Sequence, residues 1–166
     1  MEKKKLKFCK ERKMTRCGIA VWGLGNHAIN RILPAISSTQ GLNLVGVCSR
    51  SKSKVSLVSG LWNCEGWNSY EEMLASKKVD IIYISTPISL HYPFSLLALN
   101  SQKHVWCEKP MARSLKQTKH LISVAKKNDK LICESLMYLY HPHFQKVKKI
   151  VESKSFGKVI SINCKF

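Results

Sequence analysis

Residues 17–28, CGIAVWGLGNHA, constrain the fold of this chain more than any other stretch. Residues 17–22 are nearly all apolar, which is typical of a strand buried on both faces, as in a parallel sheet. Two glycines follow at once, and apolar residues at helical spacing come next: Ile29, Ile32, Leu33 and Ile36. The pattern predicts a strand, a tight turn and then a helix that Pro34 distorts locally.

The same alternation continues along the chain. Further strands are predicted at residues 42–49, 79–86, 104–108, 130–135 and 158–166. Helical patterns lie between them, from about residue 51, at 68–76 with Asn68 or Ser69 as N-cap, from about 90 to 100, at 115–127 and at 142–153. Strands that alternate with helices form βαβ units. The sequence therefore predicts an α/β fold, a Rossmann-type doubly wound parallel sheet with helices on both faces.

The turn GLGNHA has the form GxGxxA and lies between a strand and a helix, the context in which such a turn binds a dinucleotide. Gly23 permits the tight turn, and Gly25 lets backbone amides approach a pyrophosphate. Ala28 is small enough for close packing of helix on strand. The first N–H groups of the helix would face the phosphates. A plain strand-to-helix turn is the alternative.

The second strand ends at Cys48, Ser49 and Arg50, where a carboxylate that binds the ribose of NAD is common. An arginine at this position can instead bind a 2′-phosphate through charge-assisted hydrogen bonds, with Ser49 as a further donor. The absence of a carboxylate therefore favours NADP over NAD. The alternative is that Arg50 is merely solvated.

Two more motifs follow, STPISLH at residues 85–91 and HVWCEKPM at residues 104–111. In the second, an apolar run stops abruptly at Glu108, Lys109 and Pro110, which predicts either a solvated turn or a reactive lysine at the open end of the sheet. The order of the four motifs resembles the Gfo/Idh/MocA family of NAD(P)-dependent oxidoreductases. The resemblance covers roughly residues 15–166.

The resemblance implies a role for each matching residue. Gly23, Leu24, Gly25, Asn26, His27 and Ala28 would hold the pyrophosphate, and Ser49, Arg50 and Lys54 the adenosine ribose or its phosphate. Thr86, Pro87 and His91 would line the nicotinamide half of the cleft, with Glu108 and Lys109 as the catalytic residues. Lys109 would position the substrate hydroxyl or share in its proton transfer, with Glu108 as a hydrogen-bond partner, and the peptide Lys109-Pro110 would be cis. The implied reaction is hydride transfer between the nicotinamide and a sugar- or polyol-like hydroxyl or carbonyl.

The resemblance also predicts the domain organisation. Residues 1–14 would be a disordered basic tail, residues 15–140 the cofactor domain, and residues 141–166 the start of an α+β substrate domain, of which residues 158–166 would be the first strand. Family members continue for about a further domain, so the chain is expected to be a fragment, a truncated reading frame or a stand-alone module. A catalytically silent NADP-binding or regulatory protein is the alternative function. A homo-oligomer is expected only if the second domain is present.

Composition limits the other functions and locations that the protein can have. The net charge of +18 is spread along the chain, with a modest excess in the first 16 residues. It predicts non-specific affinity for polyanions and indicates no specific nucleic-acid partner, although binding through the basic tail stays a lesser alternative. No apolar run approaches the roughly 18 residues of a membrane span, and no secretory signal is evident, so a cytoplasmic protein is expected. The seven cysteines form no CxxC pair and predict buried free thiols and no metal site.

Overall fold

The computed structural model describes residues 16–163. Contacts divide the chain between Glu134 and Ser135 into two compact units, a few residues before the predicted boundary at residue 140. The predicted basic tail, residues 1–14, lies outside the described residues. Each unit is described separately below.

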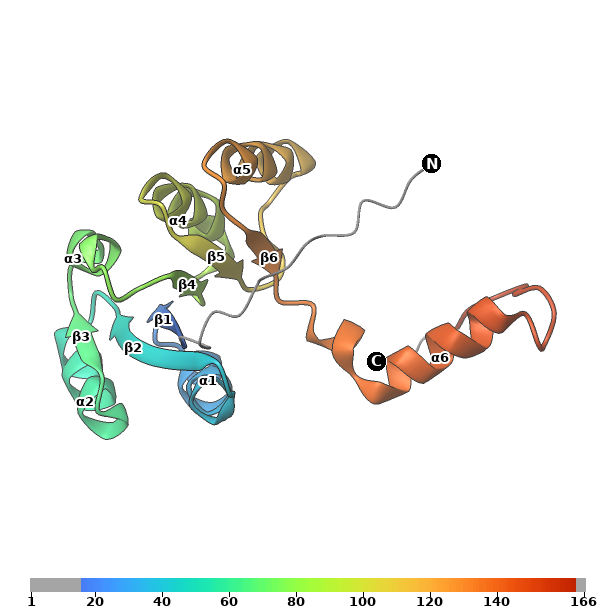
Figure 1. The fold of residues 1–166 in the computed structure, drawn as a ribbon, viewed down its shortest axis with the longest axis horizontal. Helices are drawn as coiled ribbons and strands as arrows, with labels where there is room; N and C mark the ends of the chain where they lie inside the picture. The colour runs from blue at the N-terminus through green and yellow to red at the C-terminus, as the bar shows by residue number, and fades with distance from the viewer. Residues whose placement is uncertain (1–15, 164–166) are drawn as a thin grey trace, which may run out of the picture. The chain divides into compact units, whose positions relative to one another are not determined.

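The first unit is built on a six-stranded parallel sheet in the order β3-β2-β1-β4-β5-β6 (Figure 1). The strands are β1 (Cys17–Trp22), β2 (Leu42–Cys48), β3 (Glu65–Trp67), β4 (Ile81–Ile84), β5 (His104–Cys107) and β6 (Ile132–Glu134). The order reverses between β1 and β4, which makes this junction the switch point of a doubly wound sheet. The predicted Rossmann-type fold is confirmed. The sequence did not predict β3, because its three residues include a glutamate and a glycine and form no apolar run.

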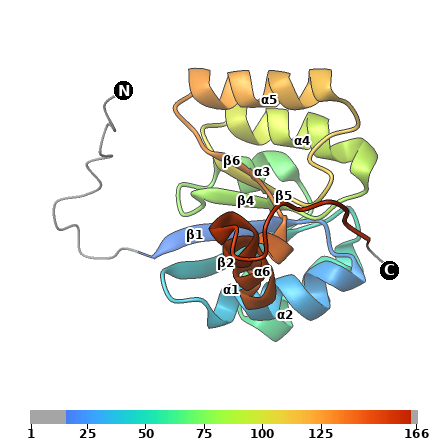
Figure 2. The same cartoon turned by 90° about the vertical axis from the view of Figure 1, so that its right-hand side faces the viewer.

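Helices cover both faces of this sheet. On one face lie the π-helical turn η1 (Ala28–Ile32), α1 (Leu33–Ser38) and α2 (Lys52–Trp62). On the other lie α3 (Tyr70–Ala75), α4 (Ile88–Asn100) and α5 (Leu115–Lys127), and Figure 2 shows α4 and α5 side by side. The predicted distortion near Pro34 is confirmed, since η1 precedes it and Pro34 lies in the first turn of α1, where a missing N–H costs little.

Serine side chains fix where several of these helices begin. The hydroxyls of Ser51, Ser69 and Ser114 accept hydrogen bonds from backbone N–H groups in the first turns of α2, α3 and α5. Each bond satisfies one of the donors that a helix start leaves without an intrahelical acceptor. Of the two N-caps predicted for α3, the structure has Ser69, and the predicted bounds of α5 are confirmed.

The core consists of two apolar clusters, one on each face of the sheet. Cys48 and Cys107 are buried, and burial raises the pKa of both thiols to about 12, so they remain protonated at neutral pH. Cys17 and Cys133 are exposed free thiols, so the expectation of burial was wrong for both. Cys17 is the first residue of its strand, and Cys133 lies on β6, which is an edge strand with one neighbour.

Trp22 and Trp106 lie in predicted strands, so the sequence predicts that both are core residues, but the two differ. Trp22 is buried and its ring stacks on that of Phe94 at 3.9 Å. Trp106 is 37% exposed, although it was also expected in the core. Val105 and Cys107 face the cluster beneath α4 and α5, so Trp106 points to the opposite face, where α1 and α2 pack under β2 and β3 rather than under β5.

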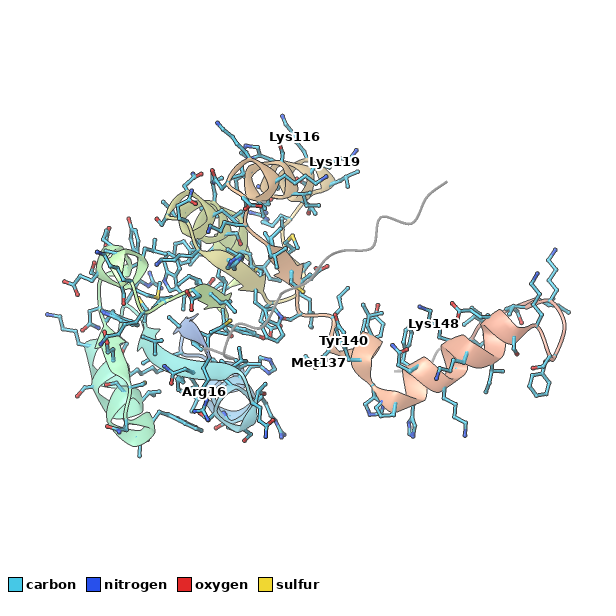
Figure 3. The ribbon with its side chains drawn as sticks, viewed as in Figure 1. Arg16, Lys116, Lys119, Met137, Tyr140 and Lys148 are labelled. Atoms are coloured by element: carbon cyan, nitrogen blue, oxygen red, sulfur yellow. The ribbon has the colours of Figure 1, made fainter. Side chains whose placement is uncertain are left out.

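The second unit contains a short 3₁₀ turn, η2 (Met137–Tyr140), and α6 (Pro142–Ser153), whose predicted bounds are confirmed. Met137 and Tyr140 are exposed (Figure 3). Four apolar residues of α6 are exposed as well: Phe144, Val147, Ile150 and Val151. The strand predicted at 158–166 is not formed over residues 158–163, and the remainder of that stretch is not described. A strand needs a neighbour to accept and donate its backbone hydrogen bonds, and no described residues pair with this segment.

The positive charge is dispersed, as the sequence indicated. Lys116 and Lys119 are exposed on α5 of the first unit, whereas Lys148 is exposed on α6 of the second (Figure 3). Within residues 16–163, no helix is long and apolar enough to cross a membrane.

Candidate active site

All four sequence motifs come to one edge of the sheet. Strand register pairs Trp22 with Cys48 and with Ile84, and Ile84 with Cys107. The residues that follow these strands therefore lie together at their carboxyl ends, on both sides of the switch point. In an open parallel sheet, ligands bind in the crevice at this position.

The glycine-rich turn is closely packed at its first glycine and open at its second. Gly23 has φ +107°, and a Cβ added there would lie 2.5 Å from the carbonyl oxygen of Ser85, so only glycine fits. A Cβ added at Gly25 would meet no atom within 4 Å. The protein's own packing thus explains Gly23, whereas the space in front of Gly25 is free for a ligand.

The remaining residues of the turn divide into core and surface. Ala28 is fully buried, and Leu24 is 4% exposed, so both side chains belong to the core under the turn. Asn26 and His27 are exposed at the start of the helix. The backbone N–H groups of this first helical turn are those that an anion would bind.

The loop after β2 carries uncompensated positive charge. Arg50 and Lys54 are both exposed, and no ion pair within residues 16–163 includes either. The hydroxyl of Ser49 accepts from the backbone N–H of Ser51 at 3.3 Å. The Asn68 side-chain amide donates to the Ser49 carbonyl at 3.1 Å, which fixes this loop to the end of β3. The sequence did not predict this role for Asn68, because β3 itself was missed.

Glu108 is 9% exposed at the end of β5, and three donors surround its carboxylate. Oε1 accepts from the Tyr83 hydroxyl and lies 3.0 Å from Nε2 of His27, and Oε2 lies 3.3 Å from the backbone N of Lys109. The predicted cis peptide Lys109-Pro110 is present. Lys109 is exposed, and no described residue forms an ion pair with its ammonium group.

The hydrogen-bond partner predicted for Glu108 was therefore wrong. The hydrogen bond suggested between its carboxylate and the Lys109 side chain is not formed, since Tyr83 and His27 hold the carboxylate instead. Tyr83 was missed because nothing in its strand distinguishes it from an ordinary core residue. Only the pairing of β4 with β5 brings it beside Glu108.

His91 lies behind the site rather than in its wall. It is 1% exposed, and its ring nitrogens lie 2.8 Å from the carbonyl oxygens of Thr86 and Pro110. It therefore joins the loop after β4 to the loop after β5. The expectation that His91 lines the nicotinamide half of the cleft does not fit this burial.

The loop after β4 retains one unsatisfied polar atom. Pro87 is exposed at the start of α4, and Oγ1 of Thr86 is buried with no hydrogen-bond partner among the described residues. Buried hydroxyls are normally hydrogen-bonded, so an orphaned one at the carboxyl edge of the sheet is an available contact for a ligand.

The fold and the glycine-rich turn together define a dinucleotide-binding Rossmann domain. The sequence model of the Gfo/Idh/MocA oxidoreductases, described as an oxidoreductase family with an NAD-binding Rossmann fold, matches residues 17–136. The chain belongs to this family.

Relatives within the family act on sugars and polyols. The chain is 28% identical to a dTDP-3,4-didehydro-2,6-dideoxy-alpha-D-glucose 3-reductase of Streptomyces violaceoruber, over 89% of this chain and 43% of the relative. It is 33% identical to the scyllo-inositol 2-dehydrogenase (NADP(+)) IolU of Bacillus subtilis, over 75% of this chain and 38% of the relative. The structure of KijD10, a 3-ketoreductase from Actinomadura kijaniata in complex with TDP-benzene and NADP, superposes with a TM-score of 0.80 at 26% identity. That match covers 85% of this chain and 45% of KijD10, so this chain spans less than half the length of these relatives.

Replacing His91 by leucine tests its structural role. His91→Leu removes the ring N–H that donates to a carbonyl oxygen of Thr86 or Pro110 and is expected to lower the free energy of unfolding by about 1–3 kcal/mol. Urea unfolding followed by circular dichroism measures the change. The control is His120→Leu, which removes an exposed histidine whose ring is hydrogen-bonded to the Tyr92 hydroxyl. An equal effect of the two substitutions would contradict the assignment.

Proposed function

We propose that this chain binds NADP at the carboxyl edge of its sheet and serves hydride transfer between the cofactor and a sugar- or polyol-class hydroxyl or carbonyl. The observation that carries the proposal is the free space in front of Gly25, at the switch point of the sheet. Three further features fit the same ligand: the helix start at Asn26, the orphaned Thr86 hydroxyl and the Arg50 guanidinium, which forms no ion pair with a described residue.

Substitutions at the two glycines of the turn are expected to affect cofactor binding and folding separately. Gly25→Ala is expected to fold normally, because the added methyl group meets no protein atom, yet to weaken NADPH binding about tenfold or more, because it fills the space a pyrophosphate needs. Isothermal titration measures the affinity. Gly23→Ala is the contrasting variant, expected to lose stability by about 1–3 kcal/mol through strain and collision with Ser85. A Gly25→Ala protein that binds NADPH like the parent would refute this site.

The cofactor preference is argued from charge. Arg50 and Lys54 follow the second strand, and no carboxylate stands there to bind a ribose diol and repel a 2′-phosphate. A guanidinium forms paired hydrogen bonds to phosphate oxygens, so it favours NADP. KijD10, solved with NADP, and the NADP(+)-dependent IolU support this preference without deciding it for this chain.

Arg50→Ala tests the preference. Removal of a charge-assisted hydrogen bond is expected to weaken NADPH binding by about tenfold, with NADH affinity changed less than twofold or so, because NADH has no phosphate at this position. Titration of both cofactors into parent and variant measures the ratio of affinities. The control is Arg31→Ala, which likewise removes one exposed positive charge, from η1. An equal loss for NADH and NADPH would contradict a 2′-phosphate contact.

In this proposal, Lys109 transfers the proton. A bound nicotinamide supplies or accepts the hydride. When hydride moves to or from a carbon that bears oxygen, a proton must move on that oxygen, and a positioned amine can transfer it. Lys109 is exposed at the edge of the sheet and free of ion pairs with described residues, so its ammonium group is available to a substrate oxygen. Glu108 and His91 hold the loop that carries it.

Lys109→Ala separates catalysis from cofactor binding. NADPH oxidation would be screened spectrophotometrically with ketoses, inosose-type ketones and nucleotide-linked keto sugars. With any substrate the parent reduces, Lys109→Ala is expected to lower turnover at least about 100-fold while changing NADPH affinity little. Lys116→Ala, on α5, is the control. NADPH binding by the parent with no turnover on any substrate would favour the alternative, a silent NADP-binding module.

A further inference from the structure

Tyr83 has no role in any expectation drawn from the sequence. It lies on β4 and is 3% exposed, and its ring contacts that of Trp106 on β5 at 5.5 Å. Its aromatic body belongs to the cluster under α1 and α2. Its hydroxyl donates a hydrogen bond to Oε1 of Glu108. A tyrosine with an apolar body and one directed polar atom is suited to orient its partner.

The Glu108 carboxylate is turned towards the glycine-rich turn. Two donors meet at Oε1, the Tyr83 hydroxyl and Nε2 of His27, and the latter lies 3.0 Å away. Oε2 faces the backbone N of Lys109. A nearly buried carboxylate is stable only when donors satisfy its oxygens, and here the described donors lie on three different parts of the chain.

Lys109 is the next residue and carries the opposite charge. A carboxylate and an ammonium group on neighbouring residues can form an ion pair when both side chains are free to turn towards each other. Here the ammonium group has no ion pair within residues 16–163. An amine that must engage a substrate oxygen is more useful free than paired with a carboxylate, because pairing favours its protonated form and occupies its donors.

We propose that Tyr83 is a positioning residue that holds the Glu108 carboxylate against His27 and so keeps it away from the Lys109 ammonium group. The use of Lys109 for proton transfer rests on the proposed function. The direction of the carboxylate and the state of the amine do not, and they can be measured in the free chain.

The test is the rate at which Lys109 is acetylated. The full chain, without cofactor, is treated with a low concentration of acetic anhydride, and peptide mass spectrometry follows Lys109, with exposed Lys116 as internal reference. Tyr83→Phe removes only the hydroxyl. The freed carboxylate is expected to pair with Lys109 and to slow its acetylation by about two- to fivefold, the range of an exposed ion pair. In Tyr83→Phe/Glu108→Gln, the parent rate is expected to return.

Two controls complete the design. Tyr92→Phe removes another phenolic hydroxyl that bonds to a side chain, that of His120, and is expected to leave the Lys109 rate unchanged. Glu108→Gln alone is also expected to leave that rate within about twofold of the parent. A faster rate in Glu108→Gln would show that Glu108 already pairs with Lys109, and an unchanged rate in Tyr83→Phe would show that Tyr83 does not hold the carboxylate. Either result overturns the proposal.

A folding defect is recognised in the same data. Lys103 is 9% exposed, with its ammonium group 2.8 Å from the carbonyl oxygens of Ser76 and Val79. It stays protected in a folded variant and reacts in an opened one. If Tyr83→Phe opens, Glu108→Gln still overturns the proposal when its Lys109 reacts faster than that of the parent. NADPH titration of the parent is run separately. Failure to bind would refute the proposed function and leave the acetylation result valid.

Discussion

The contact on which the site depends is the approach of the backbone at Gly23 to the backbone at Ser85. A side chain at Gly23 would lie 2.5 Å from the Ser85 carbonyl oxygen, so the turn after β1 can pass the end of β4 only because that residue has none. Two hydrogen bonds fix the same junction: Gly23 N–H donates to Cys48, and Ser85 N–H donates to Trp22. The ends of β2, β1 and β4 are thereby held in register where the strand order reverses.

That junction explains why motifs far apart in the sequence lie together at one edge of the sheet. Once β1 and β4 are fixed, parallel pairing of β4 with β5 places Tyr83 opposite Trp106, so the Tyr83 hydroxyl reaches Glu108 two residues further along, and the turn brings His27 to the same carboxylate. His91 then joins the two loops from behind, through carbonyl oxygens rather than through side chains. Tyr83, Glu108 and His91 are nearly buried, where an unsatisfied group would cost free energy, so their contacts together restrict the loops to one arrangement.

The elements that the sequence predicts well are those with local signals. Serine caps mark the starts of α2, α3 and α5, and Pro142 marks the start of α6, whereas long apolar runs mark β1 and β2. Elements defined by their neighbours were missed or misjudged. β3 exists because β2 offers it an edge, Trp106 is exposed because of where the helices pack, and residues 158–163 form no strand without a partner.

The candidate site likewise has features that the sequence predicts locally and features that depend on distant residues. The motifs correctly predicted that Gly23, Arg50, Thr86 and Lys109 would follow the ends of strands at one edge. Contacts between side chains were beyond reach, because they span 25 residues for Tyr83 with Glu108 and 81 for His27 with Glu108. Glu108 and Lys109 are neighbours in sequence, and the prediction that they are hydrogen-bond partners rested on this proximity. His91 was assigned to the cleft because of its motif, although its ring is buried.

The difference between Glu108 and Lys109 follows from where each charge can be satisfied. The carboxylate lies at 9% exposure and requires donors from the protein, and the glycine-rich turn and β4 supply them. The ammonium group is exposed, so water satisfies it at little cost and no protein acceptor is needed. Two residues of opposite charge can thus stand side by side without pairing, since one is anchored inward and the other remains solvated. A change that removed the inward donors would leave that carboxylate free to turn towards Lys109, so the availability of the lysine depends on donors supplied by the neighbouring strand β4 and by the turn after β1.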